Sequence, residues 1–104
     1  MTIRTQTPPS LVGQPKASFD VDAFDPSIMP STGTPEPGGL SSSQAMTLLE
    51  GWHDLNWVGM DCTEVAPPYD HAELTSNAAA TLIWTWLCGR IVARTRTLDG
   101  IRGC

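Results

Sequence analysis

The chain has 104 residues, of which 40% are hydrophobic and 16% charged, so it is one domain or part of one, and its four Trp argue against disorder. No apolar run reaches the roughly 20 residues of a membrane helix, and the first residues contain no apolar core of a signal peptide. The three Cys are too few and too irregularly spaced for a disulfide framework. We therefore expect a cytoplasmic protein with reduced thiols. The net charge is −5, and residues 17–89 hold ten acids without any Lys or Arg, which argues against nucleic-acid binding.

The N-terminal half of the chain is expected to contain one strand between two irregular segments. Residues 1–16 are rich in Pro and Thr and are predicted to be a disordered leader. Residues 17–22 alternate as in a strand, with Phe19 and Val21 on one side and two aspartates on the other. Residues 25–40 contain four Pro and a Gly pair, which predicts a long, stiff loop.

The C-terminal half predicts helix, strand and helix. Residues 41–52 have the capping-box residues Ser41 and Gln44, followed by apolar residues at helical spacing. Residues 56–65 are predicted to be a strand that is covered on both faces, because apolar residues occur at both alternating positions. A long helix is expected over residues 73–94, and residues 96–104 are predicted to be a frayed tail.

This order of elements is typical of an α/β protein with a parallel sheet. Two parallel strands do not form an independent sheet, because strands of this kind are usually buried on both faces. Residues 17–95 are therefore expected to be part of a larger doubly wound domain.

Three carboxylates are candidate site residues. Asp20 and Asp22 are two positions apart on the first strand, which would place them side by side at its carboxyl edge, where they could bind one hard cation or bridge two. The alternative is that one of them caps a loop and the other is solvated. Glu64 ends the second strand and could pair with a guanidinium, or be an ordinary surface glutamate.

The remaining reactive residue types do not indicate a catalytic group. His53 and His71 are isolated from other ligands, and single histidines are more often surface or capping residues than metal ligands. Cys62 and Cys88 lack the His and carboxylate arrangement of a nucleophile. No catalytic residue is therefore assigned.

Three stretches together resemble the C-terminal part of the ureohydrolase family of arginase, agmatinase, guanidinobutyrase and formimidoylglutamase. They are SFDVDAFDP at 18–26, TGTPEPGGL at 32–40, and LNWVGMD at 55–61 running into EVAPPYD at 64–70. They follow the family's order, and the resemblance covers about residues 17–93. The last stretch is more similar to agmatinase and guanidinobutyrase than to arginase.

The resemblance implies a three-layer α/β/α fold and a pair of Mn²⁺ ions. It implies that Asp20 bridges both metals, that Asp22 is a terminal ligand of one, and that Glu64 contacts the guanidinium of the substrate. The implied reaction is hydrolysis of a guanidino compound to urea and an amine by a water that two cations acidify. Homo-oligomers are expected for full-length relatives, and no nucleic-acid or membrane partner is expected.

The chain also departs from the family pattern. It lacks the upstream Gly-Gly-Asp-His and Asp-Ala-His-x-Asp types of segment, which supply the remaining metal ligands, including both histidines. We therefore expect a C-terminal fragment of an agmatinase-type enzyme that is inactive alone. A guanidinobutyrase-type enzyme and a non-catalytic remnant of the family are the alternatives.

Overall fold

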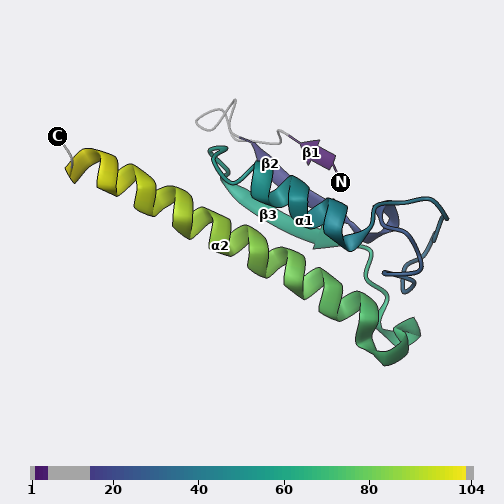
Figure 1. Ribbon diagram of the computed structural model, residues 1–104. Helices are drawn as coiled ribbons and strands as arrows, with labels where there is room; N and C mark the ends of the chain where they lie inside the picture. The colour runs from purple at the N-terminus through teal and green to yellow at the C-terminus, as the bar shows by residue number, and fades with distance from the viewer. Residues whose placement is uncertain (1, 5–14, 103–104) are drawn as a thin grey trace.

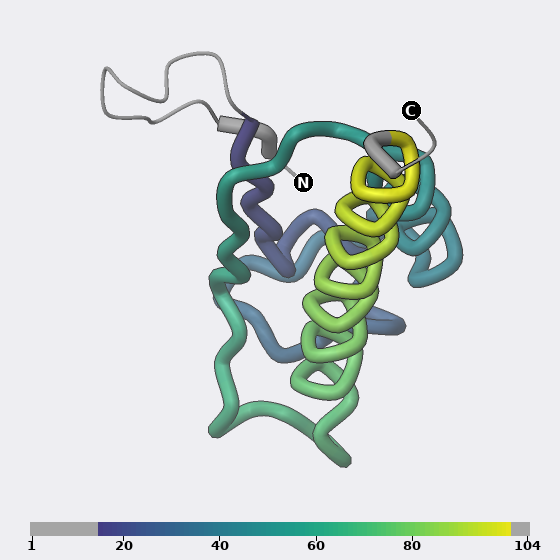
Figure 2. The backbone as a smooth tube through the Cα atoms, turned by 90° about the vertical axis from the view of Figure 1, so that its left-hand side faces the viewer, coloured from purple at the N-terminus to yellow at the C-terminus, as the bar shows by residue number. Residues whose placement is uncertain are grey.

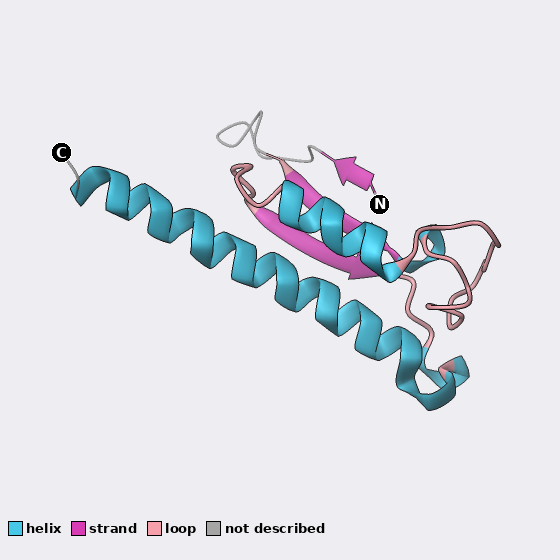
Figure 3. Ribbon diagram, in the orientation of Figure 1, coloured by secondary structure: helices cyan, strands magenta, loops and turns pink. Residues whose placement is uncertain are grey.

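The computed structural model describes residues 2–4 and 15–102, which form a three-stranded sheet and two helices (Figure 1). The strands are β1 (Thr2–Arg4), β2 (Lys16–Asp20) and β3 (Gly59–Thr63), and the helices are α1 (Ser42–Gly51) and α2 (Leu74–Arg102). Short 3₁₀ turns follow β2 and precede α2, and the long connection between β2 and α1 is irregular, as expected (Figure 3).

The sheet has the order β1-β2-β3. Strands β2 and β3 are parallel, with Phe19 opposite Cys62 and Asp20 opposite Thr63, which confirms the predicted parallel pair. Strand β1 pairs antiparallel with β2, so the expectation of a disordered leader is wrong for residues 2–4. A strand of three residues is too short to show an alternating pattern in the sequence. Its stability comes from pairing with β2. Lys16, the last residue of the predicted leader, is already part of β2, and residues 1 and 5–14 lie outside the described residues.

Both helices lie on the same face of the sheet (Figure 2). The alternation predicted for β2 is confirmed on this face, where Ala17, Phe19 and Val21 are buried. They pack with residues from the loop and both helices, among them Phe24, Met29, Ala45, Leu49, Trp57 and Leu82. The described residues thus form a two-layer, partial α/β fold.

The opposite face of the sheet is polar. The hydroxyl of Ser18 donates to Asp61 Oδ1 at 2.5 Å, and Lys16 Nζ lies 2.5 Å from Asp61 Oδ2. No described helix covers this face, so the expectation that the second strand is covered on both sides is not met within the described residues. Strand β3 is also shorter at both ends than the predicted strand over residues 56–65, and its C-terminal end coincides with the positive φ of Glu64.

Helix α1 forms as the sequence predicts. Ser41 is its N-cap, and both halves of the capping box with Gln44 are present. Ala45 and Leu49 face the core. The capping bonds satisfy backbone groups that the first helical turn would otherwise leave unpaired.

Helix α2 is longer than predicted, since it continues to Arg102, past the end of the sheet (Figure 1). The frayed tail expected over residues 96–104 is therefore wrong as far as Arg102, and residues 103–104 lie outside the described part. Thr95 and Thr97 donate to the carbonyls of Ile91 and Ala93, one helical turn earlier, so these polar residues are accommodated within the helix. In the described part of the chain, no helix is long and apolar enough to cross a membrane.

Candidate functional site

The carboxyl ends of β2 and β3 bring two of the candidate residues to one edge of the sheet. Asp20 is the last residue of β2 and is opposite Thr63, the last residue of β3. Glu64 follows Thr63 directly. The sequence expectation that both carboxylates lie at this edge is met, which is where open α/β sheets place their ligands.

Asp20 and Asp22 do not project side by side from a strand, which corrects the expected geometry. Strand β2 ends at Asp20, and residues Val21–Ala23 turn into a 3₁₀ helix. Asp20 caps this turn, because its Oδ1 accepts the amide N–H of Asp22 at 3.0 Å. The local hydrogen bond competes with strand continuation, as short Asp side chains often do. Asp22 is thereby redirected toward the long loop.

The carboxylate of Asp22 accepts hydrogen bonds from two threonines of that loop. Thr32 Oγ1 donates to Asp22 Oδ1, and Thr34 Oγ1 donates to Asp22 Oδ2. From the sequence alone, residues 32–40 are interpreted only as a rigid connector or a family motif. The hydrogen bonds from the two threonines to Asp22 are therefore not predicted. The signal that the sequence offered was the pair of Thr in a segment where glycine and proline fix the backbone.

The loop is held in place from its two ends by Asp25. Its Oδ1 accepts the amide of Ser27 at 2.9 Å and its Oδ2 accepts the amide of Gly38 at 2.8 Å. The pKa of Asp25 is lowered by the Ser27 hydroxyl first, and then by the amides of Ser27 and Gly38, because these donors favour the ionised form. Gly39 passes so close to the backbone of Phe24 that a Cβ would lie 2.5 Å from its carbonyl carbon.

Glu64 has an unusual backbone conformation. Its φ is 71°, in the left-handed region that non-glycine residues rarely adopt, and its side chain is exposed. Local strain of this type concentrates at functional positions, where the surrounding structure imposes it. Two residues later, the Ala66 amide donates to Ser31 O at 2.9 Å, which connects this segment to the loop.

The described residues do not form a complete metal site. Asp20 and Asp22 supply hard oxygen donors of the kind that Mn²⁺ accepts. Among the described residues there is no group of three or more His, Cys, Asp or Glu that could hold a metal ion. Two carboxylates do not complete the coordination of a cation with six or more ligand positions. The donor set therefore does not fit a complete binuclear centre, although its chemistry is suitable.

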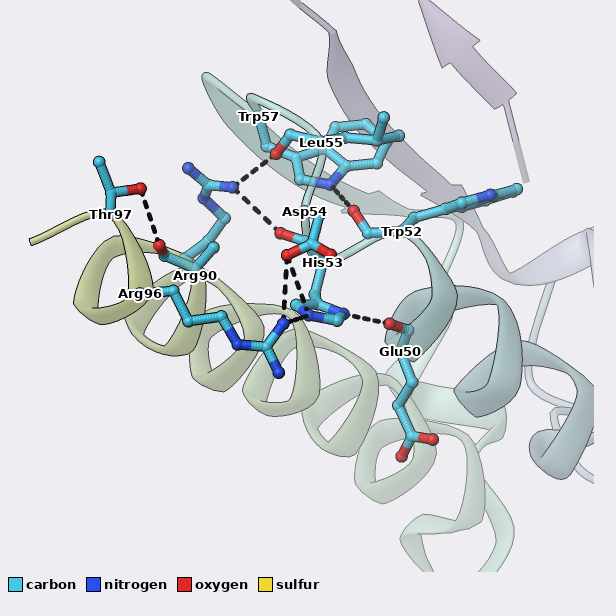
Figure 4. A network of polar contacts seen from close by, with 10 residues as sticks. Glu50, Trp52, His53, Asp54, Leu55, Trp57, Arg90, Arg96 and Thr97 are labelled. Atoms are coloured by element: carbon cyan, nitrogen blue, oxygen red, sulfur yellow. Dashed lines mark hydrogen bonds and ion pairs between the residues drawn. The ribbon is translucent and has the colours of Figure 1, made fainter. Parts of the chain in front are cut away.

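Among the described residues, His53 and Cys62 form no group of metal ligands with the carboxylates of this edge. The Nε2 of His53 lies 3.1 Å from Asp54 Oδ1 and 3.0 Å from Arg96 Nη1, in a network between the α1–β3 turn and α2 (Figure 4). Burial, followed by the charges of Asp61 and Asp20, raises the pKa of the Cys62 thiol. A raised pKa favours the protonated thiol, which is a poorer nucleophile than the thiolate.

A pocket at the other end of the sheet does not coincide with the candidate site. It measures about 710 Å³ and is lined by Arg90, Arg94 and the turn at 54–56. The turn at 54–56 precedes β3, and Arg90 and Arg94 lie in the C-terminal half of α2, whereas the carboxylates follow the ends of β2 and β3. This pocket is therefore separate from the edge that holds Asp20 and Glu64.

Comparison with known proteins identifies the family. The sequence model of the Arginase family matches residues 13–89, a range that includes Asp20, Asp22 and Glu64. Agmatinase of Chromobacterium violaceum is 52% identical over 71 residues, which are 68% of this chain and 22% of that protein. Agmatinase of Cronobacter sakazakii is 57% identical over 65 residues, which are 62% of this chain and 21% of that protein.

Solved structures agree with this result. Proclavaminate amidino hydrolase from Streptomyces clavuligerus superposes with a TM-score of 0.72 at 42% identity, covering 75% of this chain and 26% of that one. A hypothetical agmatinase from Burkholderia thailandensis gives a TM-score of 0.68 at 46% identity, covering 77% and 26%. The chain spans about a fifth of the length of the curated relatives that it matches. The family match, the identities and the arginase-like fold together show that this chain belongs to the arginase family, on its agmatinase-like side.

Proposed function

We propose that this chain carries the C-terminal share of the active site of a manganese-dependent, agmatinase-type ureohydrolase, which hydrolyses a guanidino compound to urea and an amine. The observation that supports this most directly is the meeting of Asp20 and Glu64 at one sheet edge, inside the segment that matches the Arginase family. The relatives at 52–57% identity are agmatinases, which favours agmatine as the substrate. A cytoplasmic location, indicated by the cysteine usage, is part of the proposal.

In this proposal Asp20 and Asp22 are metal ligands, with Asp20 serving both ions and Asp22 one. Bound Mn²⁺ would supply a Lewis acid that lowers the pKa of a water molecule. Thr32 and Thr34 orient the carboxylate of Asp22. Because the described residues offer an incomplete ligand set, we expect the chain alone to be inactive and to need the upstream part of the fold.

Glu64 is proposed to bind the guanidinium of the substrate. A carboxylate can accept two parallel N–H bonds from a guanidinium, and such charge-assisted bonds are stronger than neutral ones. Its exposed side chain at the sheet edge is accessible to a substrate. The strained backbone of Glu64 supports a functional role.

Supplying the missing region tests the proposal. The chain is co-expressed with, or fused to, the upstream region of an agmatinase relative, and urea release from agmatine and 4-guanidinobutyrate is measured with Mn²⁺. We expect urea from the restored protein and none from the chain alone. Faster turnover of 4-guanidinobutyrate would favour the guanidinobutyrase alternative. No urea from a folded, metal-loaded assembly would favour the non-catalytic remnant.

Substitutions in the restored protein separate the proposed roles. Asp20→Asn should lose both ions and Asp22→Asn mainly one, as counted by elemental analysis. Glu64→Gln should keep its metals and raise KM about 10- to 100-fold, since a hydrogen bond to a charged group is worth roughly 1.5–3 kcal/mol. Glu73→Gln is the control and should change little. If Glu64→Gln lost its metals while Asp20→Asn kept both, the assigned roles would be wrong.

A further inference from the structure

Two buried polar residues connect the long loop to the start of α2. Ser31 and Thr75 are 1% and 0% exposed, and they are the buried polar or charged residues of the described part of the chain. The amide N–H of Ser31 donates to Thr75 Oγ1 at 3.0 Å across 44 positions of sequence. Leaving a buried polar group without a hydrogen-bond partner is energetically costly. This contact therefore holds the backbone of Ser31 next to the first turn of α2.

Ser31 also binds the segment that follows Glu64. Its hydroxyl donates to the carbonyl of Ala66, and the Ala66 amide donates back to Ser31 O at 2.9 Å. Ser31 is thus bonded to two partners at once, one in the 64–70 segment and one in α2. We call the contacts among Ser31, Ala66 and Thr75 the buried polar link.

Asp70 fixes the α2 end of the buried polar link. Its Oδ1 accepts the Thr75 amide at 3.0 Å, and its Oδ2 accepts the Ser76 amide at 2.9 Å and the Ser76 hydroxyl at 2.5 Å. These bonds satisfy amides of the first helical turn. Thr75 is therefore held through its backbone while its hydroxyl holds Ser31.

The sequence neighbours of the buried polar link are the candidate site residues. Ser31 precedes Thr32, whose hydroxyl donates to Asp22. Ala66 comes two residues after Glu64, which has its φ at 71°. A shift of Ser31 relative to Ala66 would consequently move the threonine that holds Asp22 relative to the strained glutamate.

We propose that Ser31 and Thr75 are positioning residues that set the place of Glu64 relative to Asp22. The functional meaning rests on the proposed function, because it takes Asp22 as a metal ligand and Glu64 as the guanidinium-binding residue. The structural coupling does not depend on that function. It is carried by hydrogen bonds between buried groups, which have few alternative partners.

Amide hydrogen exchange of the full chain, followed by NMR, tests the coupling. Thr75→Val keeps the branched shape but removes the acceptor of the Ser31 amide. The amides of Ser31 and Ala66 should then exchange at least 10-fold faster, and the amide shifts of Thr32 and Glu64 should move together. Thr75→Ser restores the hydroxyl and should restore both readouts. Thr81→Val is the matched control, because the Thr81 hydroxyl only bonds within α2, to Asn77 O at 2.9 Å.

Two results would overturn the coupling. One is unchanged exchange at Ala66 in Thr75→Val, and the other is an equal acceleration of all amides, including those of β2 and β3, without rescue by Thr75→Ser. In the restored protein, Thr75→Val should lower kcat/KM for agmatine about 10-fold at unchanged manganese content, with rescue by Thr75→Ser. If the restored wild type released no urea, the proposed function would fail, while hydrogen exchange would still decide the coupling.

Discussion

At the scale of single residues, the backbone of Glu64 is the feature that sequence reasoning had no means to detect. Glu64, Ala72 and Glu73 have φ values of 71°, 51° and 57°. A left-handed conformation costs a non-glycine L-residue roughly 1–2 kcal/mol, because its Cβ crowds the following carbonyl. At Glu64 this conformation ends β3 and begins the turn toward α2. The cost is retained at a position whose side chain is proposed to bind substrate.

Replacing Glu64 by glycine should therefore separate stability from function. Glu64→Gly is expected to stabilise the chain by up to about 1 kcal/mol, since glycine adopts positive φ without the Cβ contact. Urea unfolding measures this change. Glu73→Gly is the control, because it relieves the same type of conformation outside the proposed site. In the restored protein only Glu64→Gly should abolish agmatine turnover, and a destabilised Glu64→Gly chain would contradict the strain argument.

Gly39 is required by a close approach between two parts of the loop. A Cβ there would lie 2.6 Å from the amide nitrogen of Asp25 and 2.8 Å from the carbonyl oxygen of Ala23. These backbone atoms cannot rotate away, so Gly39→Ala should destabilise the chain by about 1–3 kcal/mol, the usual cost of overpacking. Gly33→Ala has no atom within 4 Å of its Cβ and should change stability little. Equal urea midpoints for the two variants would refute this reading.

At the scale of elements, local signals were sufficient for α1 and the core of β2. The capping pair of Ser41 and Gln44 and the alternation around Phe19 are properties of neighbouring residues, and both are present in the structure. The end of α2 and strand β1 depend on longer-range stability that short sequence windows do not contain. The candidate site shows the same difference between local signals and contacts with residues farther away in the sequence. Strand ends indicated the edge of Asp20 and Glu64, whereas the bonds from Thr32 and Thr34 to Asp22 join residues ten and twelve positions away in sequence.

Helix α2 should carry a pH-dependent contribution to stability through Asp70. The Ser76 hydroxyl is the largest cause that lowers the pKa of Asp70 from its ordinary value of 3.8. Burial opposes this effect, and the backbone amides of Ser76 and Thr75 lower the pKa further. A folded-state pKa below the unfolded one gives stability that is complete above about 3.8 and is lost as the pH falls through the folded value.

Asp70→Asn should therefore weaken the chain at neutral pH, because a neutral amide oxygen is a weaker acceptor for the N–H groups of Thr75 and Ser76 than a carboxylate. The difference from wild type should shrink as the pH falls below 3.8. Urea unfolding at a series of pH values measures both effects. Asp99→Asn, near the other end of the same helix, is the control and should follow the wild-type profile. A constant difference between Asp70→Asn and wild type at all pH values would rule out the linkage.

At the scale of the whole molecule, the uncovered surfaces are as informative as the core. Both helices cover one face of the sheet (Figure 2). Several large apolar side chains of α2 remain exposed. Trp84, Ile91 and Leu98 are 68%, 66% and 51% exposed. Their spacing of seven residues keeps them on one stripe of the helix. Relatives that are about three times longer have additional chain with which such surfaces could be buried.

The chain by itself is therefore expected to self-associate. Exposed apolar stripes of this kind promote association in water, because contact with another apolar surface removes them from solvent. Sedimentation velocity should show oligomers at micromolar concentration, and the double substitution Trp84→Lys with Ile91→Lys should shift the chain toward monomer. Thr47→Lys adds a charge to an exposed position of α1 and serves as the control, with the wild-type distribution expected. A wild-type chain that sediments as a monomer and unfolds in one sharp cooperative transition would contradict this prediction, since it would show that the described core is sufficient alone.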